Sequence, residues 1–136
     1  MVARVKGAML FEDSLVTCRF NTLTALDLIC RAINASTGWD MDFREAMTVG
    51  RRAANLARAF NLRAGIGAEL DAPSMRYGST PLDGPLAGRG IMPHWDKMVR
   101  NYYEKMGWDA STGVPLPDTL RNLGLAEVVP HLWPQG

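Results

Sequence analysis

Residues 42–62, DFREAMTVGRRAANLARAFNL, carry the strongest helical pattern in the chain and decide its fold class. Asp42 and Glu45 stand three residues apart, as in a capping box, where each side chain bonds the other's backbone amide at the start of a helix. The predicted buried stripe of this helix consists of Phe43, Ala46, Met47, Gly50, Ala53, Ala54, Ala57 and Phe60. Because several of these residues are Gly or Ala, a second backbone can approach the helix closely.

Two further segments show apolar residues at three-and-four spacing, which predicts helices at about 22–37 and 95–106. A short final helix is predicted at about 117–123, because Asp118 lies near its start and Gly124 follows its end. Asn21 or Thr22 is the expected N-cap of the first of these helices. Each predicted helix is followed closely by a glycine, the residue that most often ends helices.

The rest of the chain is less regular. Residues 1–20 have one weak helical face, made of Val2, Val5, Met9 and Leu10, with Gly7 lowering the helix propensity. Residues 65–94 contain six Gly and four Pro without a sustained period, and loops of that length usually serve a function or cover a partner surface. Strand signals are weak throughout. The sequence therefore predicts an all-α fold, an irregular helical domain with long Gly/Pro-rich connections.

Length and composition limit the function classes. A chain of 136 residues has room for one hydrophobic core, so residues 1–136 are predicted to form a single domain. Hydrophobic residues at 47% exclude a wholly disordered chain, and a net charge of +1 lacks the basic excess of nucleic-acid binders. No apolar run is long enough to cross a bilayer and no signal-peptide pattern is visible, so we expect a cytoplasmic protein without membrane contact.

Several polar groups allow both a functional and a structural interpretation. His94 and His131 could serve a metal or a small independent active site, but a half-exposed histidine beside a helix is the commoner case. Asp40 and Asp42 resemble the first ligands of a calcium loop, and Arg44 then stands where another oxygen ligand is needed.

Arginines and tyrosines on the predicted helices leave similar alternatives open. Arg44, Arg51 and Arg58 are seven residues apart and line one helix side, either to bind phosphate or carboxylates or as a solvated face. Tyr102 and Tyr103 favour packing, one toward the core and one at its edge, over a stacking platform.

The two cysteines are too few for a disulfide framework. Cys18 lies just before a predicted helix, where backbone amides stabilise a thiolate, although a lone cysteine is more often a small buried residue. Cys30 lies on an apolar helix stripe, so we expect a core residue. One cysteine cannot hold an iron–sulfur cluster unaided, because such clusters take four ligands.

The order of motifs resembles the C-terminal part of the tungsten-containing aldehyde ferredoxin oxidoreductase family. The most specific segments lie within residues 50–65, GRRAANLARAFNLRAG, and 102–109, YYEKMGWD. The other matching segments, in the same order as in the family, are residues 13–20 (DSLVTCRF), 96–98 (DKM), 113–115 (GVP) and 120–125 (LRNLGL).

The resemblance implies an oxidoreductase that oxidises aldehydes to carboxylic acids with ferredoxin as electron acceptor. In this family a bis-pterin cofactor holds tungsten or molybdenum, and a 4Fe-4S cluster takes its fourth cysteine from an Asp-x-x-Gly-Leu-Cys motif. That motif maps onto residues 13–18, so the resemblance implies that Asp13 binds the pterin and Cys18 is the fourth cluster ligand. Val16 stands at the motif's glycine and Thr17 at its leucine.

The family's three-cysteine motif and its β-rich cofactor domain are not found in these 136 residues. By resemblance, we expect no complete cofactor and no activity in the isolated chain. The expected partners are the N-terminal and central domains, or a large subunit, of the same enzyme, with ferredoxin for the assembled enzyme. The alternative is a stand-alone helical interaction or structural module that keeps the fold without redox activity.

Overall fold

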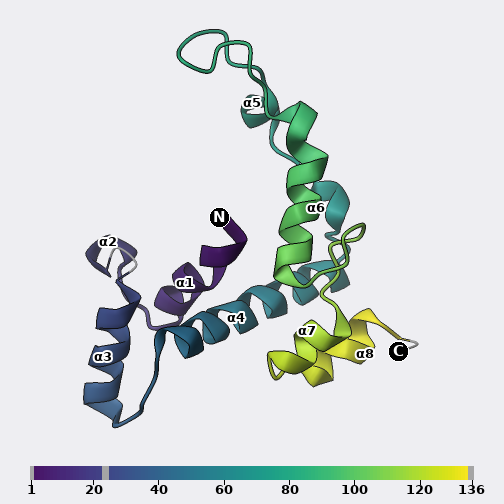
Figure 1. Cartoon of the computed structure of the whole chain (residues 1–136). Helices are drawn as coiled ribbons and strands as arrows, with labels where there is room; N and C mark the ends of the chain where they lie inside the picture. The colour runs from purple at the N-terminus through teal and green to yellow at the C-terminus, as the bar shows by residue number, and fades with distance from the viewer. Residues whose placement is uncertain (1, 23–24, 135–136) are drawn as a thin grey trace.

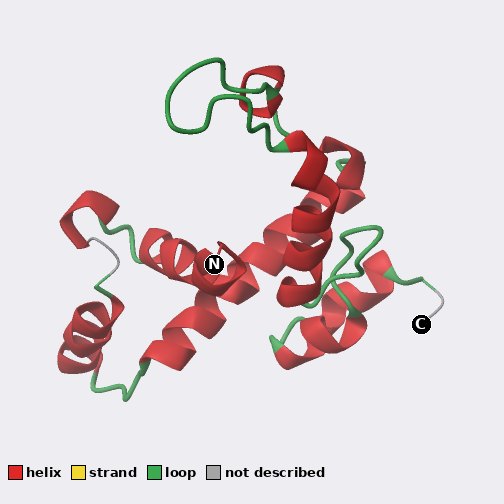
Figure 2. Cartoon of the chain, turned by 45° about the horizontal axis from the view of Figure 1, so that its top comes forward, coloured by secondary structure: helices red, strands yellow, loops and turns green. Residues whose placement is uncertain are grey.

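The computed structural model describes residues 2–22 and 25–134. Within these residues the chain is helical and contains no strand, which confirms the predicted all-α class (Figures 1 and 2). One isolated bridge joins Trp108 to Pro115. The α-helices are α1 (Val2–Ser14), α2 (Arg19–Thr22), α3 (Leu26–Thr37), α4 (Phe43–Arg63), α5 (Met75–Gly78), α6 (Trp95–Met106), α7 (Pro117–Asn122) and α8 (Val129–Leu132). The 3-10 helices are η1 (Ala68–Leu70), η2 (Met92–His94) and η3 (Ala126–Val128).

The central helix is α4, against which α1, α3, α6 and the C-terminal helices pack (Figure 1). The predicted capping box is confirmed at its start. The Asp42 Oδ1 atom accepts a hydrogen bond of 2.8 Å from the Glu45 amide, and the Glu45 Oε2 atom accepts one of 3.4 Å from the Asp42 amide. Both carboxylates also lie at the positive end of the helix dipole, which stabilises them there. The capping box and the dipole together fix the first residue of the helix.

Helices α1 and α4 meet backbone to backbone. A Cβ atom on Gly50 would lie 1.8 Å from the Gly7 carbonyl oxygen, and one on Gly7 would lie 2.6 Å from the Met47 carbonyl oxygen. No side chain fits at either contact, because real Cβ atoms do not approach other atoms this closely. The expected close approach of a second backbone is therefore confirmed at Gly50.

The helical face predicted for the N-terminal segment is wrong for Val2 and Val5, whereas Met9 and Leu10 are half-buried as expected. Val2 and Val5 are exposed, and α1 instead buries Ala3, Ala8 and Phe11 together with Gly7. The small residues face α4 because only they permit the short distance between the helix axes. Gly7, interpreted from the sequence as a weak point of the helix, is the contact itself.

The start predicted for the third helix is also wrong. Helix α3 begins at Leu26 rather than near residue 22, and its N-cap is Ala25, which makes no side-chain cap hydrogen bond. Asn21 and Thr22 belong instead to the short helix α2. Leu23, which the sequence places on the apolar face of this helix, lies outside the described residues.

Buried apolar side chains gather in three clusters along α4 instead of one core. The first cluster joins α1, α3 and the start of α4, the second joins α1, α4 and α6, and the third joins α4 to the C-terminal helices. Their main members are Ala8, Phe11, Leu26, Ile29, Cys30 and Ala46 in the first, Ala3, Ala54, Tyr103, Met106 and Trp108 in the second, and Ala59, Leu120, Leu125, Val128 and Val129 in the third.

The stripe predicted for α4 is correct in its centre and wrong at its ends. Ala46, Gly50 and Ala54 are buried and Met47 and Ala53 are half-buried, whereas Phe43 and Phe60 are 53% and 72% exposed and Ala57 is also exposed. The buried side of α4 turns along its length because a different helix covers each part. Towards its C-terminal end the buried residues are Asn55, Arg58 and Ala59.

The molecule exposes much surface for its size. Its accessible area is 9646 Å², whereas a compact monomer of 15.0 kDa exposes about 7,000 Å². Residues 65–94 contribute to this excess, since the part between α5 and α6 extends away from the helices as an open loop (Figures 1 and 2). In the described part of the chain, no helix is both long and apolar enough to span a membrane.

Candidate functional site

The segment that carries Asp13 and Cys18 lies at one end of α1. Asp13 is exposed in the last turn of this helix, and Cys18 is an exposed free thiol directly before α2. Four residues separate the two side chains along a tight reversal of the backbone. Both groups are therefore accessible to a partner molecule at the same end of the protein.

The reversal is built by hydrogen bonds to the last turn of α1. The Glu12 carbonyl oxygen accepts bonds from the Leu15 and Thr17 amides at 3.1 and 3.4 Å, and the Asp13 carbonyl accepts one from the Val16 amide at 3.1 Å. The Thr17 hydroxyl also donates to the Glu12 carbonyl, at 3.1 Å. The segment thus has a defined path before it reaches the cysteine.

Val16 has an unusual backbone conformation. Its φ angle is +56°, and among the described residues it is the one non-glycine residue with positive φ. This left-handed region is easily reached by glycine but strained for a β-branched residue. The resemblance described above maps Val16 onto a motif glycine, the residue type that adopts this conformation most easily. Its side chain is 94% exposed and points to solvent.

Beyond Cys18 the chain turns back toward α1. The Cys18 carbonyl accepts bonds from the Asn21 and Thr22 amides, at 2.9 and 3.2 Å, which form the single turn of α2. The Thr22 hydroxyl donates to the Oε1 atom of Glu12 at 2.5 Å. Glu12 is completely buried, and it was not singled out by the sequence because no pattern marks a carboxylate that faces its own chain.

The chain offers a single thiol for metal binding. Among the described residues no three His, Cys, Asp or Glu side chains gather closely enough to hold a metal ion. Cys30 is buried in the first cluster, and burial, reinforced by Asp27 and Asp42, raises the pKa of its thiol. The expectation that Cys30 is a core residue is confirmed. Cys18, in contrast, is exposed.

A second cluster of polar side chains, built around Arg58 and Asp71, lies where α4, α6 and the start of residues 65–94 meet. The Arg58 guanidinium contacts both carboxylate oxygens of Asp71, at 3.2 and 2.8 Å, and donates through Nε to the Gly113 carbonyl at 3.0 Å. It also lies over the rings of Tyr103 and Trp108, at 5.7 and 5.2 Å from their centroids. Arg58 therefore binds its own chain and is neither a phosphate ligand nor part of a solvated face.

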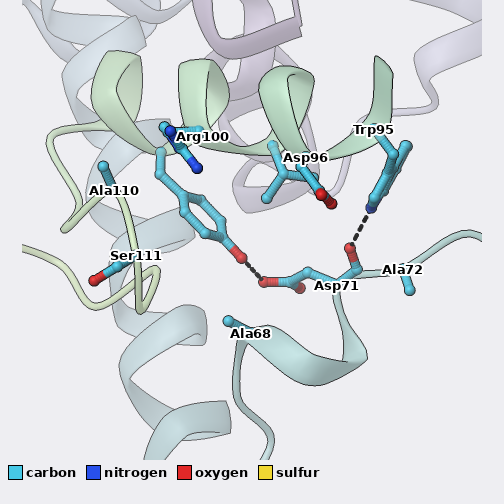
Figure 3. Close-up of a pocket in the computed structure, with 10 residues that line it drawn as sticks. Ala68, Asp71, Ala72, Trp95, Asp96, Arg100, Ala110 and Ser111 are labelled. Atoms are coloured by element: carbon cyan, nitrogen blue, oxygen red, sulfur yellow. Dashed lines mark hydrogen bonds between the residues drawn. The ribbon is translucent and has the colours of Figure 1, made fainter. Parts of the chain in front are cut away.

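Asp71 is held from a third side by α6. The Tyr103 hydroxyl donates to the Asp71 carboxylate, and the Trp95 indole donates to the Asp71 carbonyl at 3.1 Å (Figure 3). Burial, followed by the hydrogen bond and negative charge of Asp71, raises the pKa of Tyr103 to about 12. A cavity of about 390 Å³ opens beside this group and is lined by Ala68, Asp96, Arg100 and Ser111 among others (Figure 3).

The remaining candidates from the sequence have structural or exposed positions. Tyr103 is buried and Tyr102 half-buried, which confirms the expected packing of the pair. Arg51 donates to the Ala3 carbonyl at 2.9 Å, so it too binds within the chain. His94 and His131 are both exposed.

Comparison with known proteins agrees with the motif order. The family model described as "Aldehyde ferredoxin oxidoreductase, domains 2 & 3" matches residues 1–125. The tungsten-containing aldehyde ferredoxin oxidoreductase of Pyrococcus furiosus is 31% identical over 133 residues, which cover 91% of this chain and 22% of that protein. The protein of the same name from Pyrococcus abyssi is 30% identical over 135 residues, covering 93% of this chain and 22% of the relative.

The chain spans about a fifth of the length of the curated relatives it matches. No solved structure matches it. The match of the family model over most of the chain, together with the ordered motifs, shows that the chain belongs to the aldehyde ferredoxin oxidoreductase family.

Proposed function

We propose that this chain supplies the C-terminal helical part of a tungstopterin and iron–sulfur oxidoreductase that converts aldehydes to carboxylic acids, with ferredoxin as electron acceptor. Family membership supports the reaction class. The single observation that carries the proposal is the exposed Cys18 thiol, which follows Asp13 on a reversal in which Val16 has φ +56°, a backbone conformation that glycine adopts easily. The remaining domains lie elsewhere, on the same or another polypeptide.

Cys18 is the proposed fourth ligand of the 4Fe-4S cluster. An exposed thiol at the end of a hydrogen-bonded reversal can reach a cluster on a facing domain, and thiolates are the usual ligands of such clusters. A bound metal–pterin group would supply the two-electron oxidation of aldehyde and water to acid and two protons, and a cluster held in part by Cys18 would supply the path of the electrons to ferredoxin. In this chain the role of Cys18 is to hold one iron at a fixed position.

Asp13 is the proposed pterin contact. Its carboxylate is exposed and accepts hydrogen bonds only, which suits the N–H groups on the edge of a pterin ring. Because Asp13 and Cys18 lie at the two ends of one reversal, the pterin and the cluster would both be bound at this end of the molecule. That arrangement gives the chain a positioning role in the assembled enzyme.

The exposed surface supports docking onto the remaining domains. The accessible area exceeds that of a compact monomer by roughly 2,600 Å², which is in the range of obligate interfaces. Apolar side chains in residues 65–94 are widely exposed, including Met75 at 94% and Leu82 at 96%. We propose that this segment covers another domain of the enzyme or borders its substrate channel.

A specific observation favours the alternative of a helical interaction module without redox activity. Val16 adds an exposed side chain where the family motif has glycine, and this side chain stands between Asp13 and Cys18 in the sequence. If it prevents close approach of the pterin, the chain keeps its docking surface and loses the cofactor contacts.

Co-expression of the chain with a polypeptide that carries the other family domains tests the two ideas. We expect an assembled complex whose iron content and aldehyde-dependent ferredoxin reduction are lost in Cys18→Ala. Cys30→Ala is the matched control, because Cys30 is buried in the first cluster and should leave the iron content unchanged. A complex that forms with unchanged iron and activity in Cys18→Ala refutes the ligand role, and a complex without iron in the parent chain supports the interaction module.

A further inference from the structure

We infer that Glu12 is a positioning residue for Cys18, holding the reversal on both sides of the cysteine against α1. The inference rests on the proposed function, in which Cys18 is a cluster ligand. Glu12 does not touch the cluster itself in this scheme. It acts through Thr17 and Thr22, which bond Glu12 on either side of the cysteine.

Glu12 is a buried carboxylic residue. Its exposed fraction is 0%, although carboxylic side chains are among those most rarely buried. Removing such a group from water is unfavourable unless hydrogen bonds compensate it. Here the compensation includes the Thr22 hydroxyl, so the side chain is directed at the segment that follows Cys18 rather than at solvent.

Glu12 contacts the segment before and after the cysteine. Before it, the Glu12 carbonyl accepts from the Leu15 amide and from both the amide and the hydroxyl of Thr17. After it, the Glu12 carboxylate accepts from the Thr22 hydroxyl, which also lies 3.4 Å from the Cys18 carbonyl oxygen. One residue of α1 thus fixes both ends of the segment.

Cys18 is exposed on a surface segment, so little besides the backbone of that segment fixes its position. Cys18 has no packing of its own, because its side chain is exposed and α2 is a single turn. Its position relative to α1 therefore depends in part on the bonds from Thr17 and Thr22 to Glu12. Loss of the contact with the carboxylate would leave the cysteine present but displaced, and a cluster with a displaced fourth thiolate loses iron more easily.

Thr22→Val is the sharpest test, since it removes the hydroxyl and keeps the side-chain shape. In the 136-residue chain we expect amide hydrogen exchange at Asn21 to become about fivefold to tenfold faster, the change expected from one lost hydrogen bond. In the co-expressed complex we expect less iron and, after one-electron oxidation with ferricyanide, the electron paramagnetic resonance signal of a three-iron cluster. Thr48→Val is the matched control, because the Thr48 hydroxyl bonds only the local Arg44 carbonyl at 2.9 Å in α4.

Rescue by a conservative variant distinguishes positioning from general stability. Glu12→Gln keeps an oxygen that can accept from Thr22, so exchange and iron content should stay close to those of the parent chain. Glu12→Met fills a similar volume without an acceptor and should behave like Thr22→Val. If Thr22→Val matches Thr48→Val in both measurements, the inference is overturned, whether or not Glu12→Met folds.

The two levels of the proposal fail in different ways. Unchanged iron in Cys18→Ala overturns the proposed function, and the inference with it. Iron that is lost in Cys18→Ala but retained in Thr22→Val and Glu12→Met overturns the inference alone.

Discussion

The guanidinium of Arg58 contacts both carboxylate oxygens of Asp71, at 3.2 and 2.8 Å, across the junction between α4 and the irregular segment that follows it. The side chains are 8% and 34% exposed, so the pair is largely shielded from solvent on the arginine side. A second ion pair, Asp118 with Arg121, joins neighbouring turns of α7 at 2.9 Å, and its side chains are 89% and 54% exposed. The stability contributed by a shielded ion pair can therefore be compared with that contributed by an exposed one in the same protein.

Asp71→Asn should destabilise the protein by about 2 kcal/mol, because it leaves the Arg58 charge poorly compensated in a buried position. The figure lies below that for a fully buried pair, since Asp71 is partly exposed. Asp118→Asn should change the free energy of unfolding by less than about 0.5 kcal/mol. Urea unfolding followed by circular dichroism measures both, and equal effects would show that Asp71 does not compensate the buried Arg58 charge.

The Tyr103 hydroxyl predicts a loss of stability at high pH. The pKa of Tyr103 is raised to about 12 from an ordinary value of 10.0, first by burial and then by Asp71. The folded state therefore keeps a proton that the unfolded state loses, so the stabilisation is complete below pH 10 and falls as pH rises toward 12. The expected loss is on the order of 2 kcal/mol.

Tyr103→Phe is the variant that checks this pH dependence. It should flatten the fall in unfolding free energy between pH 10 and 12, and it should remove the latest tyrosine step from an ultraviolet titration. In Asp71→Asn the pKa of Tyr103 should move down but stay above its ordinary value, because burial remains. A late step that persists in Tyr103→Phe would contradict the assignment.

Gly50→Ala should destabilise the protein by at least about 2 kcal/mol. The added Cβ atom would meet the Gly7 backbone at 1.8 Å, so α1 and α4 must separate. Helix propensity alone predicts the opposite sign, a gain of about 1 kcal/mol for Ala over Gly. Thermal unfolding decides between the two, and a stabilised variant would show that the helices do not meet at this residue.

Val16→Gly should stabilise the isolated chain by about 1 kcal/mol. Glycine relieves the strain of φ +56°, worth roughly 1 to 2 kcal/mol, and part of that gain is offset by the greater freedom of glycine in the unfolded chain. Val5→Gly is the comparison, since Val5 is also exposed but lies in regular helix, where glycine should destabilise. Chemical denaturation measures both variants, and the same sign in both would argue against strain at Val16.

The fold class and the centre of α4 follow from the sequence because local signals fix them. The capping box at Asp42 needs only residues three apart, and Gly50 is marked by its place among other small residues. The buried face of α1 could not be predicted in this way. It depends on which helix lies opposite, and a rule that favours large apolar residues chooses Val2 and Val5 over Ala3 and Gly7.

Among the polar residues, too, some could be identified from the sequence and others could not. Asp13 and Cys18 were found through the order of motifs, and their roles stay predictions until the ligand variants are measured. Asp71 and Glu12 were missed for a physical reason. Asp71 pairs with a residue of α4 from within an aperiodic segment, and Glu12 bonds a residue ten positions away, so neither contact leaves a spacing that can be recognised in the sequence.

The three clusters along α4 have a consequence for cooperativity. Each cluster covers a different stretch of the helix, so opening one end of the molecule need not break the contacts at the other. Unfolding should then proceed in parts rather than in one step. The first cluster contains Phe11, the neighbour of Glu12. The conformation of the Cys18 segment should therefore be lost when α1, α3 and the start of α4 open locally, and not when the C-terminal helices unfold.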